Sequence, residues 1–353
     1  MNVLDLFCGC GGISFGFKLA GYKIIGGVDI DKDSISTFKK NFPKSLPICK
    51  DLLEYSDTDI LSDFSKKKVE VIVGGPPCQG FSSANRWDKE KKDPRNKLFF
   101  EFLRFVKLLK PKIVVIENVR GILTRDNGYA KKRIEKLLNE LGYNVICEVL
   151  NASNYGVPQN RLRAFFIAIK SDYNLSFDFS RLVKKSKISV KEAIGELYEL
   201  DKIPKKQLKN KPINKFTKYL RRANQQIYNH DIIYPAKTTQ DKISYVPQGG
   251  NWKDIPLRQF KNNRNNRHSS AFKRLHEDEF SVTIDTGNAH SNYFHPIYNR
   301  IPTVREAARI QSFKDSFIIE GSRTSQYRQI GNAVLPLLAK AIAIELKNIL
   351  EEK

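Results

Sequence analysis

The sequence predicts an α/β protein in which helices cover both faces of a parallel sheet, with a second, smaller and loop-rich part. Short apolar runs alternate with amphipathic stretches through the first half of the 353-residue chain, which is the pattern of strands joined by crossover helices. The chain is longer than the roughly 250 to 300 residues at which a single core stops growing. After residue 170 the alternation gives way to sequence rich in lysine, asparagine and proline.

Each predicted element has its own local signal. The strands are short apolar runs bounded by turn residues, at 3–7, 23–28, 69–74, 112–117, 144–150 and 164–169. The helices between them repeat apolar residues at helical spacing, at 13–20, 33–41, 97–109 and 129–141. The region after 170 is predicted to hold mainly loops and short strands. Residues 333–350 return to helical spacing, and we expect this last helix to pack on the first part.

The chain carries a large positive charge. It has 61 Lys and Arg against 38 Asp and Glu, a net charge of +23 and a pI near 9.7. Residues 180–299 hold 23 basic and 11 acidic side chains, which gives +12 of the +23. This balance is typical of proteins that bind nucleic acid. The alternative explanation is an AT-rich genome, which encodes many lysines.

The five cysteines, Cys8, Cys10, Cys49, Cys78 and Cys147, are odd in number and lack paired spacing. This usage indicates a reducing compartment, so we expect a cytoplasmic protein. No Cys or His cluster accompanies Cys8 and Cys10, so no metal site is expected. No apolar run approaches the ~18 residues of a membrane span, so no membrane partner is expected.

A cysteine on a double-proline turn is the most informative motif. Pro76-Pro77-Cys78-Gln79 ends the apolar run 69–74. Prolines stiffen the turn and so present the Cys78 thiol for reaction. The alternative is a buried, inert cysteine near the end of a strand.

A glycine loop directly follows the first predicted strand, in the run Asp5-Leu6-Phe7-Cys8-Gly9-Cys10-Gly11-Gly12. Glycines let backbone N–H groups approach a ligand at the carboxyl edge of such a sheet. Asp29 falls at the tip of the next strand, where a carboxylate can accept hydrogen bonds from ribose hydroxyls. Asp51 follows a third apolar run and could meet an adenine amino group. The spacing differs from the dinucleotide GxGxxG pattern, so a ligand without a pyrophosphate fits better; an ordinary turn is the alternative.

Charged residues border two further strands. Glu117 follows the apolar run Ile113-Val114-Val115-Ile116, which places a carboxylate at the same sheet edge. Arg161 and Arg163 precede the strand 164–169 and alternate to the same side of the chain. The alternatives are a helix cap for Glu117 and an ion pair at a domain edge for the arginines.

These motifs together resemble a known family. Along the chain, and in the order in which that family has them, occur six motifs: Asp5 to Gly12, Gly75-Pro76-Pro77-Cys78-Gln79, Glu117-Asn118-Val119, Gln159-x-Arg161-x-Arg163, Arg305-Glu306-Ala307-Ala308-Arg309 and Gln329-Ile330-Gly331-Asn332-Ala333-Val334. In this it resembles the bacterial cytosine-C5 DNA methyltransferases of restriction–modification systems, except in the basic middle region. Departures are small: Cys10 stands where a small or apolar residue is more usual, and Leu335 interrupts the common ending before Pro336.

The resemblance implies a Rossmann-like methyltransferase sheet and a smaller target-recognition domain. We expect a catalytic and cofactor-binding domain over 1–182, a target-recognition domain with a hinge over 183–325, and a segment over 326–353 that returns to the first domain. The implied reaction transfers a methyl group from S-adenosylmethionine to C5 of a cytosine in a short duplex DNA site, leaving S-adenosylhomocysteine.

The resemblance also implies catalytic roles. Cys78 would attack C6 of the cytosine, Glu117 would hold or protonate N3, and Arg163, with Arg161, would stabilise O2. Cofactor contacts are implied at Phe7, Gly9, Gly11, Gly12, Asp29, Ile30, Asp51, Leu52, Pro77, Leu98, Asn332 and Val334.

Duplex DNA is the implied partner, and its target base must leave the stack to reach a cysteine. The polar stretch 81–95 suits a loop that closes over DNA, although a solvated charge run has the same composition. The resemblance implies that the basic middle region would bind phosphates and read base edges. Candidate DNA contacts, each of which could be ordinary surface, are Ser82, Arg95, Gln248, Gly249, Arg264, Arg267 and Thr283. A companion endonuclease and a monomeric state are further expectations.

Three other functions compete with this one. A tRNA cytosine methyltransferase would use the same Cys78 and Glu117, but it usually has a shorter recognition region. A catalytically silent DNA-binding regulator would not need Cys78, Glu117 and Arg163 together. A dehydrogenase is disfavoured by the glycine spacing.

Overall fold

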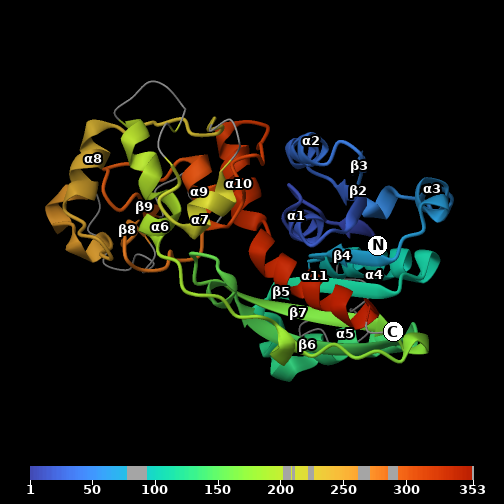
Figure 1. Cartoon of the computed structure of the whole chain (residues 1–353). Coiled ribbons are helices and arrows are strands. Elements are labelled where there is room, and N and C mark those ends of the chain that lie inside the picture. The colour runs from blue at the N-terminus through green and yellow to red at the C-terminus, as the bar shows by residue number, and fades with distance from the viewer. Residues whose placement is uncertain are drawn as a thin grey trace. The chain divides into compact units, whose positions relative to one another are not determined.

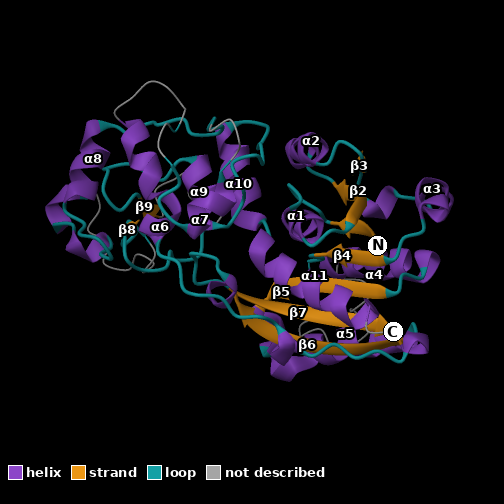
Figure 2. Cartoon of the chain, in the orientation of Figure 1, coloured by secondary structure: helices purple, strands orange, loops and turns teal. Residues whose placement is uncertain are grey.

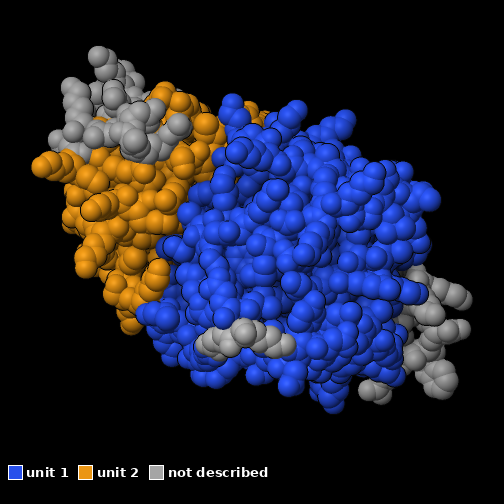
Figure 3. Space-filling view, turned by 45° about the vertical axis from the view of Figure 1, so that its right-hand side comes forward, with its two compact units in different colours: residues 1–155, 162–184, 334–353 blue, residues 156–161, 185–333 orange. Residues whose placement is uncertain are grey.

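The computed structural model describes residues 1–77, 94–201, 208, 211–221, 226–260, 271–284 and 293–351. They form two compact units, drawn in different colours in Figure 3. The sheet unit comprises residues 1–155, 162–184 and 334–353. The insert unit comprises residues 156–161 and 185–333.

The sheet unit is built on one seven-stranded sheet (Figures 1 and 2). Its strands are β1 (Asn2–Leu6), β2 (Lys23–Asp29), β3 (Leu46–Cys49), β4 (Val71–Gly74), β5 (Ile113–Val119), β6 (Tyr143–Asn151) and β7 (Leu162–Lys170). They lie in the order β3-β2-β1-β4-β5-β7-β6. The first five strands are parallel, whereas β7 is antiparallel to both β5 and β6.

The prediction of a purely parallel sheet was therefore wrong at β7. The link from β6 to β7 contains a 3₁₀ turn, Ala152–Tyr155, and no crossover helix. Parallel neighbours need a crossover of a dozen or more residues, so this short link gives an antiparallel pair. Strand β3 was missed because it has only four residues and contains Pro47, which the edge of a sheet tolerates.

Helices cover both faces of the sheet, as predicted. They are α1 (Gly12–Leu19), α2 (Lys32–Asn41), α3 (Asp57–Phe64), α4 (Pro94–Leu109), α5 (Tyr129–Glu140) and α11 (Pro336–Glu351). Alternation along β1 assigns the faces. Leu4 and Leu6 lie in a core with residues of α3, α4 and α5, whereas Asp5 points to the opposite face and bonds Ser14 of α1. Helix α11 packs against α1.

The described part of the insert unit is loop-rich, but short helices outnumber strands, which corrects the predicted emphasis on strands. The helices are α6 (Val190–Ile194), α7 (Lys215–Leu220), α8 (Lys237–Ser244), α9 (Val304–Ile310) and α10 (Arg323–Asn332), and the two strands are β8 (Lys273–Arg274) and β9 (Tyr293–Phe294). Capping boxes begin α6, α7 and α9. A capping box is a helix-start signal that depends on residue positions, so the overall composition of a region does not show it.

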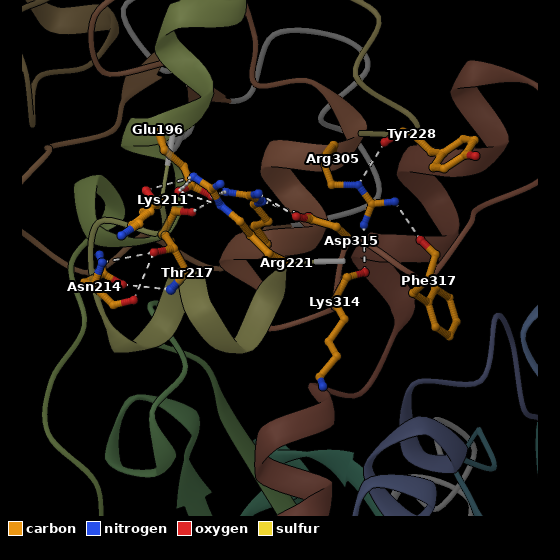
Figure 4. Close-up of polar contacts among 12 residues, drawn as sticks. Glu196, Lys211, Asn214, Thr217, Arg221, Tyr228, Arg305, Lys314, Asp315 and Phe317 are labelled. Atoms are coloured by element: carbon orange, nitrogen blue, oxygen red, sulfur yellow. Dashed lines mark hydrogen bonds and ion pairs between the residues drawn. The ribbon is translucent and has the colours of Figure 1, made fainter. Parts of the chain in front are cut away.

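Buried arginines fix the loops of the insert unit (Figure 4). Arg305 donates to the carbonyl oxygens of Tyr228, Lys314 and Phe317 at 2.9, 3.0 and 2.6 Å. Arg309 is fully buried and pairs with Asp315 and Glu196. Loop carbonyls without a ladder partner are satisfied in this way, which stabilises irregular backbone.

Candidate active site

The glycine loop makes a sharp turn after β1. Phe7 has a φ of 57° and Gly11, which caps α1, has a φ of 93°. The Gly9 N–H donates to Asp29 Oδ2 at 2.8 Å, and the Asp31 N–H donates to Asp29 Oδ1 at 2.9 Å. The Asp29 carboxylate at the tip of β2 therefore holds the loop in place, and each of its oxygens keeps a further lone pair.

The three loop glycines are required for different reasons. A Cβ on Gly12 would lie 2.2 Å from the carbonyl oxygen of Val334, and one on Gly11 would lie 2.5 Å from the ring of Phe42. A Cβ on Gly9 would meet nothing within 4 Å, although its φ is 50°. Packing requires Gly11 and Gly12, whereas Gly9 faces open space and allows close approach of a ligand.

A cavity of about 160 Å³ lies at the carboxyl edge of β1 and β2. It combines an apolar wall with two carboxylates, Asp29 and Asp51, and burial raises the pKa of Asp29 above its ordinary value. Ile30 is 66% exposed although it lines this cavity. Apolar surface beside carboxylates suits the base and hydroxyls of an adenosine. The lining residues are Phe7, Val28, Asp29, Ile30, Lys50, Asp51, Leu52, Leu53 and Leu98.

Six predicted cofactor residues thus line one cavity, and the others lie elsewhere. Val334 contacts the glycine loop through its carbonyl group. Asn332 is the last residue of α10 in the insert unit, and Pro77 ends the described segment that precedes Cys78. Val28, Lys50 and Leu53 were missed, although each is next in sequence to a predicted residue, Asp29, Asp51 or Leu52.

A second cluster lies where β4 and β5 end. These strands are parallel neighbours, so Gly74 lies opposite Ile116 and their following residues meet. A Cβ on Gly75 would lie 3.3 Å from Glu117 Oε2, and Asn118 Nδ2 donates to the Pro76 carbonyl at 3.0 Å. The turn that leads into Cys78 is therefore held against Glu117 and Asn118. Cys78 itself lies outside the described residues.

Arg163 completes this cluster. Its Nε lies 2.8 Å from Glu117 Oε1, and the two side chains are 16% and 13% exposed. The antiparallel register of β5 and β7 places Arg163 opposite Val119, two residues beyond Glu117. The reversed strand thus brings a cation to the carboxylate at this edge.

Arg161 has a different environment from Arg163. It belongs to the insert unit, is 3% exposed, and donates to the carbonyl oxygens of Ile284 at 2.8 Å and Gly331 at 2.9 Å. The two arginines are thus placed in different compact units. Arg161 fixes backbone within the insert unit.

The candidate DNA contacts divide into three groups. The Gln248 amide bonds internally, because its Oε1 accepts from Glu277 N at 2.9 Å and its Nε2 donates to Glu277 Oε2 at 3.2 Å. Gly249, with a φ of 76°, donates to the Arg274 carbonyl. Thr283 bonds the Asn160 carbonyl and lines an open groove of about 680 Å³. Ser82, Arg264 and Arg267 lie outside the described residues, and the side chain of Arg95 is also outside the description.

The loop cysteines are poor nucleophiles. Burial raises the pKa of Cys8 well above its ordinary value and that of Cys10 to about 12. Within the described ranges no group of three His, Cys, Asp or Glu residues could hold a metal ion. Asp5 was missed as a notable residue: it is 1% exposed, accepts from Ser14 Oγ at 2.7 Å, and burial raises its pKa to about 7.

The fold and this sheet edge define a class. A Rossmann-like sheet, a glycine loop without the dinucleotide spacing and a cavity with two carboxylates are the features of an S-adenosylmethionine-dependent methyltransferase. The family model of the C-5 cytosine-specific DNA methylases matches residues 1–348, and the chain belongs to this family. The family predicted from six sequence motifs is thereby confirmed.

Individual relatives agree with this assignment. The chain is 38% identical to the Type II methyltransferase M.DdeI of Desulfomicrobium norvegicum, with 97% of this chain and 88% of the relative covered. It is also 38% identical to M1.HphI of Haemophilus parahaemolyticus, with 97% and 86% covered. A prophage-encoded protein of Escherichia coli, assigned as a DNA modification methyltransferase, is similar in structure with a TM-score of 0.80, 28% identity and 99% of each chain covered.

The enzyme therefore transfers a methyl group from S-adenosylmethionine to C5 of cytosine in DNA. A Dnmt2 methyltransferase of S. pombe shares the fold, with a TM-score of 0.58 and 18% identity. Among the described helices, none has the length and hydropathy that a membrane span requires.

Proposed function

We propose that this methyltransferase modifies a specific short DNA site as part of a restriction–modification system, with Cys78, Glu117 and Arg163 as its catalytic residues. The observation that carries the proposal is the cluster at the ends of β4 and β5. Glu117 is paired with Arg163 and lies beside Gly75, three residues before Cys78. A carboxylate, a guanidinium and a presented thiol are the groups that attack on a cytosine ring needs.

The order of bond changes follows from the chemistry of the base. The Cys78 thiolate adds to C6, and the displaced electron pair makes C5 nucleophilic. Glu117 holds the N3 edge and supplies a proton there, while Arg163 stabilises the charge that develops at O2. After C5 has taken the methyl group, with S-adenosylhomocysteine as the leaving group, a base removes the C5 proton and the sulfur–C6 bond breaks. N3 returns its proton to Glu117, so the thiolate and the aromatic ring are restored.

S-adenosylmethionine supplies an electrophilic methyl group at its sulfonium. The cavity residues are proposed to bind its adenosine: Ile30 against the base, Asp29 at the ribose and Asp51 at the amino group. The open space beside Gly9 leaves room for the rest of the cofactor, which carries the methyl group. Val28, Lys50 and Leu53 join the proposed set because they line the same cavity.

Target recognition is assigned to the insert unit. Residues 185–299 of this unit hold 21 basic and 11 acidic side chains, a net charge of +10, which favours phosphate contacts. Thr283 stays a candidate for a DNA contact, since it borders an open groove and its hydroxyl, which donates to the Asn160 carbonyl, can still accept a hydrogen bond. Gln248 is assigned a structural role instead, because its amide is already bonded to Glu277. Arg161 is assigned a positioning role for Ile284, the neighbour of Thr283.

The biological setting is proposed by analogy. The relatives at 38% identity are named Type II methyltransferases, which supports a companion endonuclease that acts on the same site. We propose a monomer in the cytoplasm, as the family resemblance and the cysteine usage suggest. Bisulfite sequencing of DNA from cells that express the protein would identify the modified cytosine.

Covalent trapping tests the catalytic assignment. We expect wild-type protein, supplied with cofactor and a duplex that contains 5-fluorocytosine, to form a stable adduct, because the fluorine cannot leave as a proton does. Mass spectrometry should place the adduct on the Cys78 peptide. Cys78→Ala should form none, while Cys147→Ala, altered on β6, should react normally. Adduct formation by Cys78→Ala, or none by wild type on a duplex that it methylates, would contradict the assignment.

A further inference from the structure

We propose that Arg104 on α4 is a positioning residue for S-adenosylmethionine, because it fixes the backbone that forms one side of the cofactor cavity. The inference rests on the proposed assignment of that cavity to the adenosine. It concerns a residue outside the six motifs and outside the cavity lining.

The guanidinium of Arg104 binds the segment that follows β3. Its Nη2 donates to the carbonyl oxygens of Leu52 at 3.1 Å and Tyr55 at 2.5 Å. These two carbonyls bracket a 3₁₀ turn, Leu52–Glu54. Leu52 and Leu53 of this turn line the cavity, as does Asp51 just before it. Arg104 therefore closes the turn from outside, across 49 to 52 residues of sequence.

The turn has few bonds of its own. Asp51 caps it by accepting from Leu53 N at 3.0 Å, and Glu54 N donates to the Asp51 carbonyl at 3.0 Å. A single 3₁₀ turn fixes several dihedral angles for these bonds and is not stable in isolation. The position of the Asp51 and Leu52 side chains therefore depends on the contacts with α4.

Helix α4 reaches the cavity from two positions. Leu98 lines the cavity directly. Six residues later along the helix, Arg104 bonds the turn, and the Phe105 ring packs edge-to-face on Tyr55 with centroids 5.5 Å apart. The helix thus holds both Leu98 and the Asp51–Leu52 segment, so the width of the cavity between them is set by the Arg104 bonds.

Two acids orient the guanidinium. Arg104 Nε donates to Glu101 Oε2 at 2.7 Å, and Nη1 pairs with Asp57. The Arg104 side chain is 25% exposed, while Asp57 is 58% exposed. Ion pairs at such an exposed carboxylate contribute little, so the bonds to the carbonyls should account for most of the effect.

Direct measurement of cofactor affinity tests the role. By titration calorimetry with S-adenosylmethionine and no DNA, we expect Arg104→Ala to bind about tenfold more weakly, because it loses two charge-assisted hydrogen bonds that hold the cavity wall. Arg104→Lys should recover part of the affinity, since an ammonium can reach one carbonyl but not both as a planar fork does. Lys107→Ala, an exposed change on the same helix, is the matched control and should bind normally.

Kinetics separate positioning from a general structural role. Arg104→Ala should raise the KM for S-adenosylmethionine about tenfold with kcat at saturating cofactor and the KM for DNA nearly unchanged, and Asp57→Asn should change the cofactor KM less than about twofold. A lower melting temperature with an unchanged cofactor KM would overturn the proposal. If Arg104→Ala does not fold, Arg104→Lys decides: affinity equal to wild type would contradict the role.

A reference variant distinguishes failure of this inference from failure of the cavity assignment. Asp51→Ala should weaken S-adenosylmethionine binding, because it removes both a proposed contact with the adenosine and the cap on Leu53 N. If Asp51→Ala binds normally, the cavity is not the adenosine site. If Asp51→Ala binds weakly but Arg104→Ala binds as wild type does, the cavity assignment stands and only the Arg104 inference falls.

Discussion

At the scale of single residues, three strand-end carboxylates have three different surroundings. Asp5 is buried and bonded to Ser14, Asp29 accepts two backbone N–H bonds, and Glu117 faces the Arg163 guanidinium. Burial raises the pKa of both Asp5 and Asp29, and the backbone N–H bonds to Asp29 oppose that rise. The same chemical group can therefore be structural at one strand end and suited to catalysis at another.

Asp5 makes the stability of the fold depend on pH. Its pKa is raised from 3.8 to about 7 by burial, so the folded state binds a proton that the unfolded state has released. The contribution is present below about pH 4 and is lost as the pH rises through about 7. The Asp5→Asn variant cannot ionise. We expect the free energy of unfolding of wild type relative to this variant, followed by scanning calorimetry, to fall between pH 5 and pH 8 by on the order of 3 kcal/mol at most.

The control for Asp5 is an exposed carboxylate in the same unit. Asp172 is 72% exposed beside Lys170, and Asp172→Asn should show no comparable trend in scanning calorimetry over the same pH range. A constant difference between wild type and Asp5→Asn from pH 5 to pH 8 would show that Asp5 has the same pKa in both states.

At the scale of elements, α1 and α11 pack backbone to backbone through Gly16. A Cβ there would lie 2.5 Å from Ala339 Cβ and 2.6 Å from the Pro336 carbonyl oxygen. Alanine is favoured over glycine in a helix by about 1 kcal/mol, but overpacking of this kind costs about 1–3 kcal/mol or more. We expect Gly16→Ala to lower the free energy of unfolding in urea by about 1–2 kcal/mol.

Gly121→Ala is the matched substitution. A Cβ at Gly121 would meet nothing within 4 Å, and the φ angle of Gly121 does not lie in the positive range that only glycine adopts easily. Its urea midpoint should stay near that of wild type. Equal midpoints for the two variants would mean that α1 and α11 separate without cost.

The motif Arg305 to Arg309 also acts at the element scale. Glu306 forms the capping box of α9 with Thr303 and pairs with Arg300, while Arg305 and Arg309 bond loop carbonyls and acids. These side chains are buried and hold helices and loops of the insert unit together. A motif that indicates the family therefore need not contact substrate.

At the scale of the whole molecule, the net charge of +23 governs the encounter with DNA. Each neutralised phosphate releases counterions, so affinity falls with salt. We expect a steep log–log slope: about six phosphate contacts would lower the affinity about 10³-fold between roughly 50 and 200 mM salt. Fluorescence anisotropy with a labelled duplex measures this. Cofactor affinity without DNA should change little over the same range, and a flat DNA slope would contradict the electrostatic account.

The sequence predicted most of the sheet unit because its signals are local. Apolar runs and helical spacing give the strands and helices, and the motifs that end β1, β4 and β5 give the family, the cofactor and the reaction. Four-residue β3 and the helices of the insert unit were missed or misjudged, because a proline edge strand and short capped helices have little periodicity. Arg161 and Arg163 look equivalent in sequence, yet they belong to different units.

The residues that follow each strand, and hence the chemistry available to the protein, were determined by the sequence alone, since motif order and strand ends are properties of the chain. Tertiary structure decided which of those side chains meet. The reversal of β7 brings Arg163 to Glu117, and α4 brings Arg104 to the turn after Asp51. Asp5 is buried against Ser14, whereas Asp29 lines the cavity. Such contacts join residues far apart in the chain, and their strength depends on burial and on the geometry of the bonds, which no local pattern encodes.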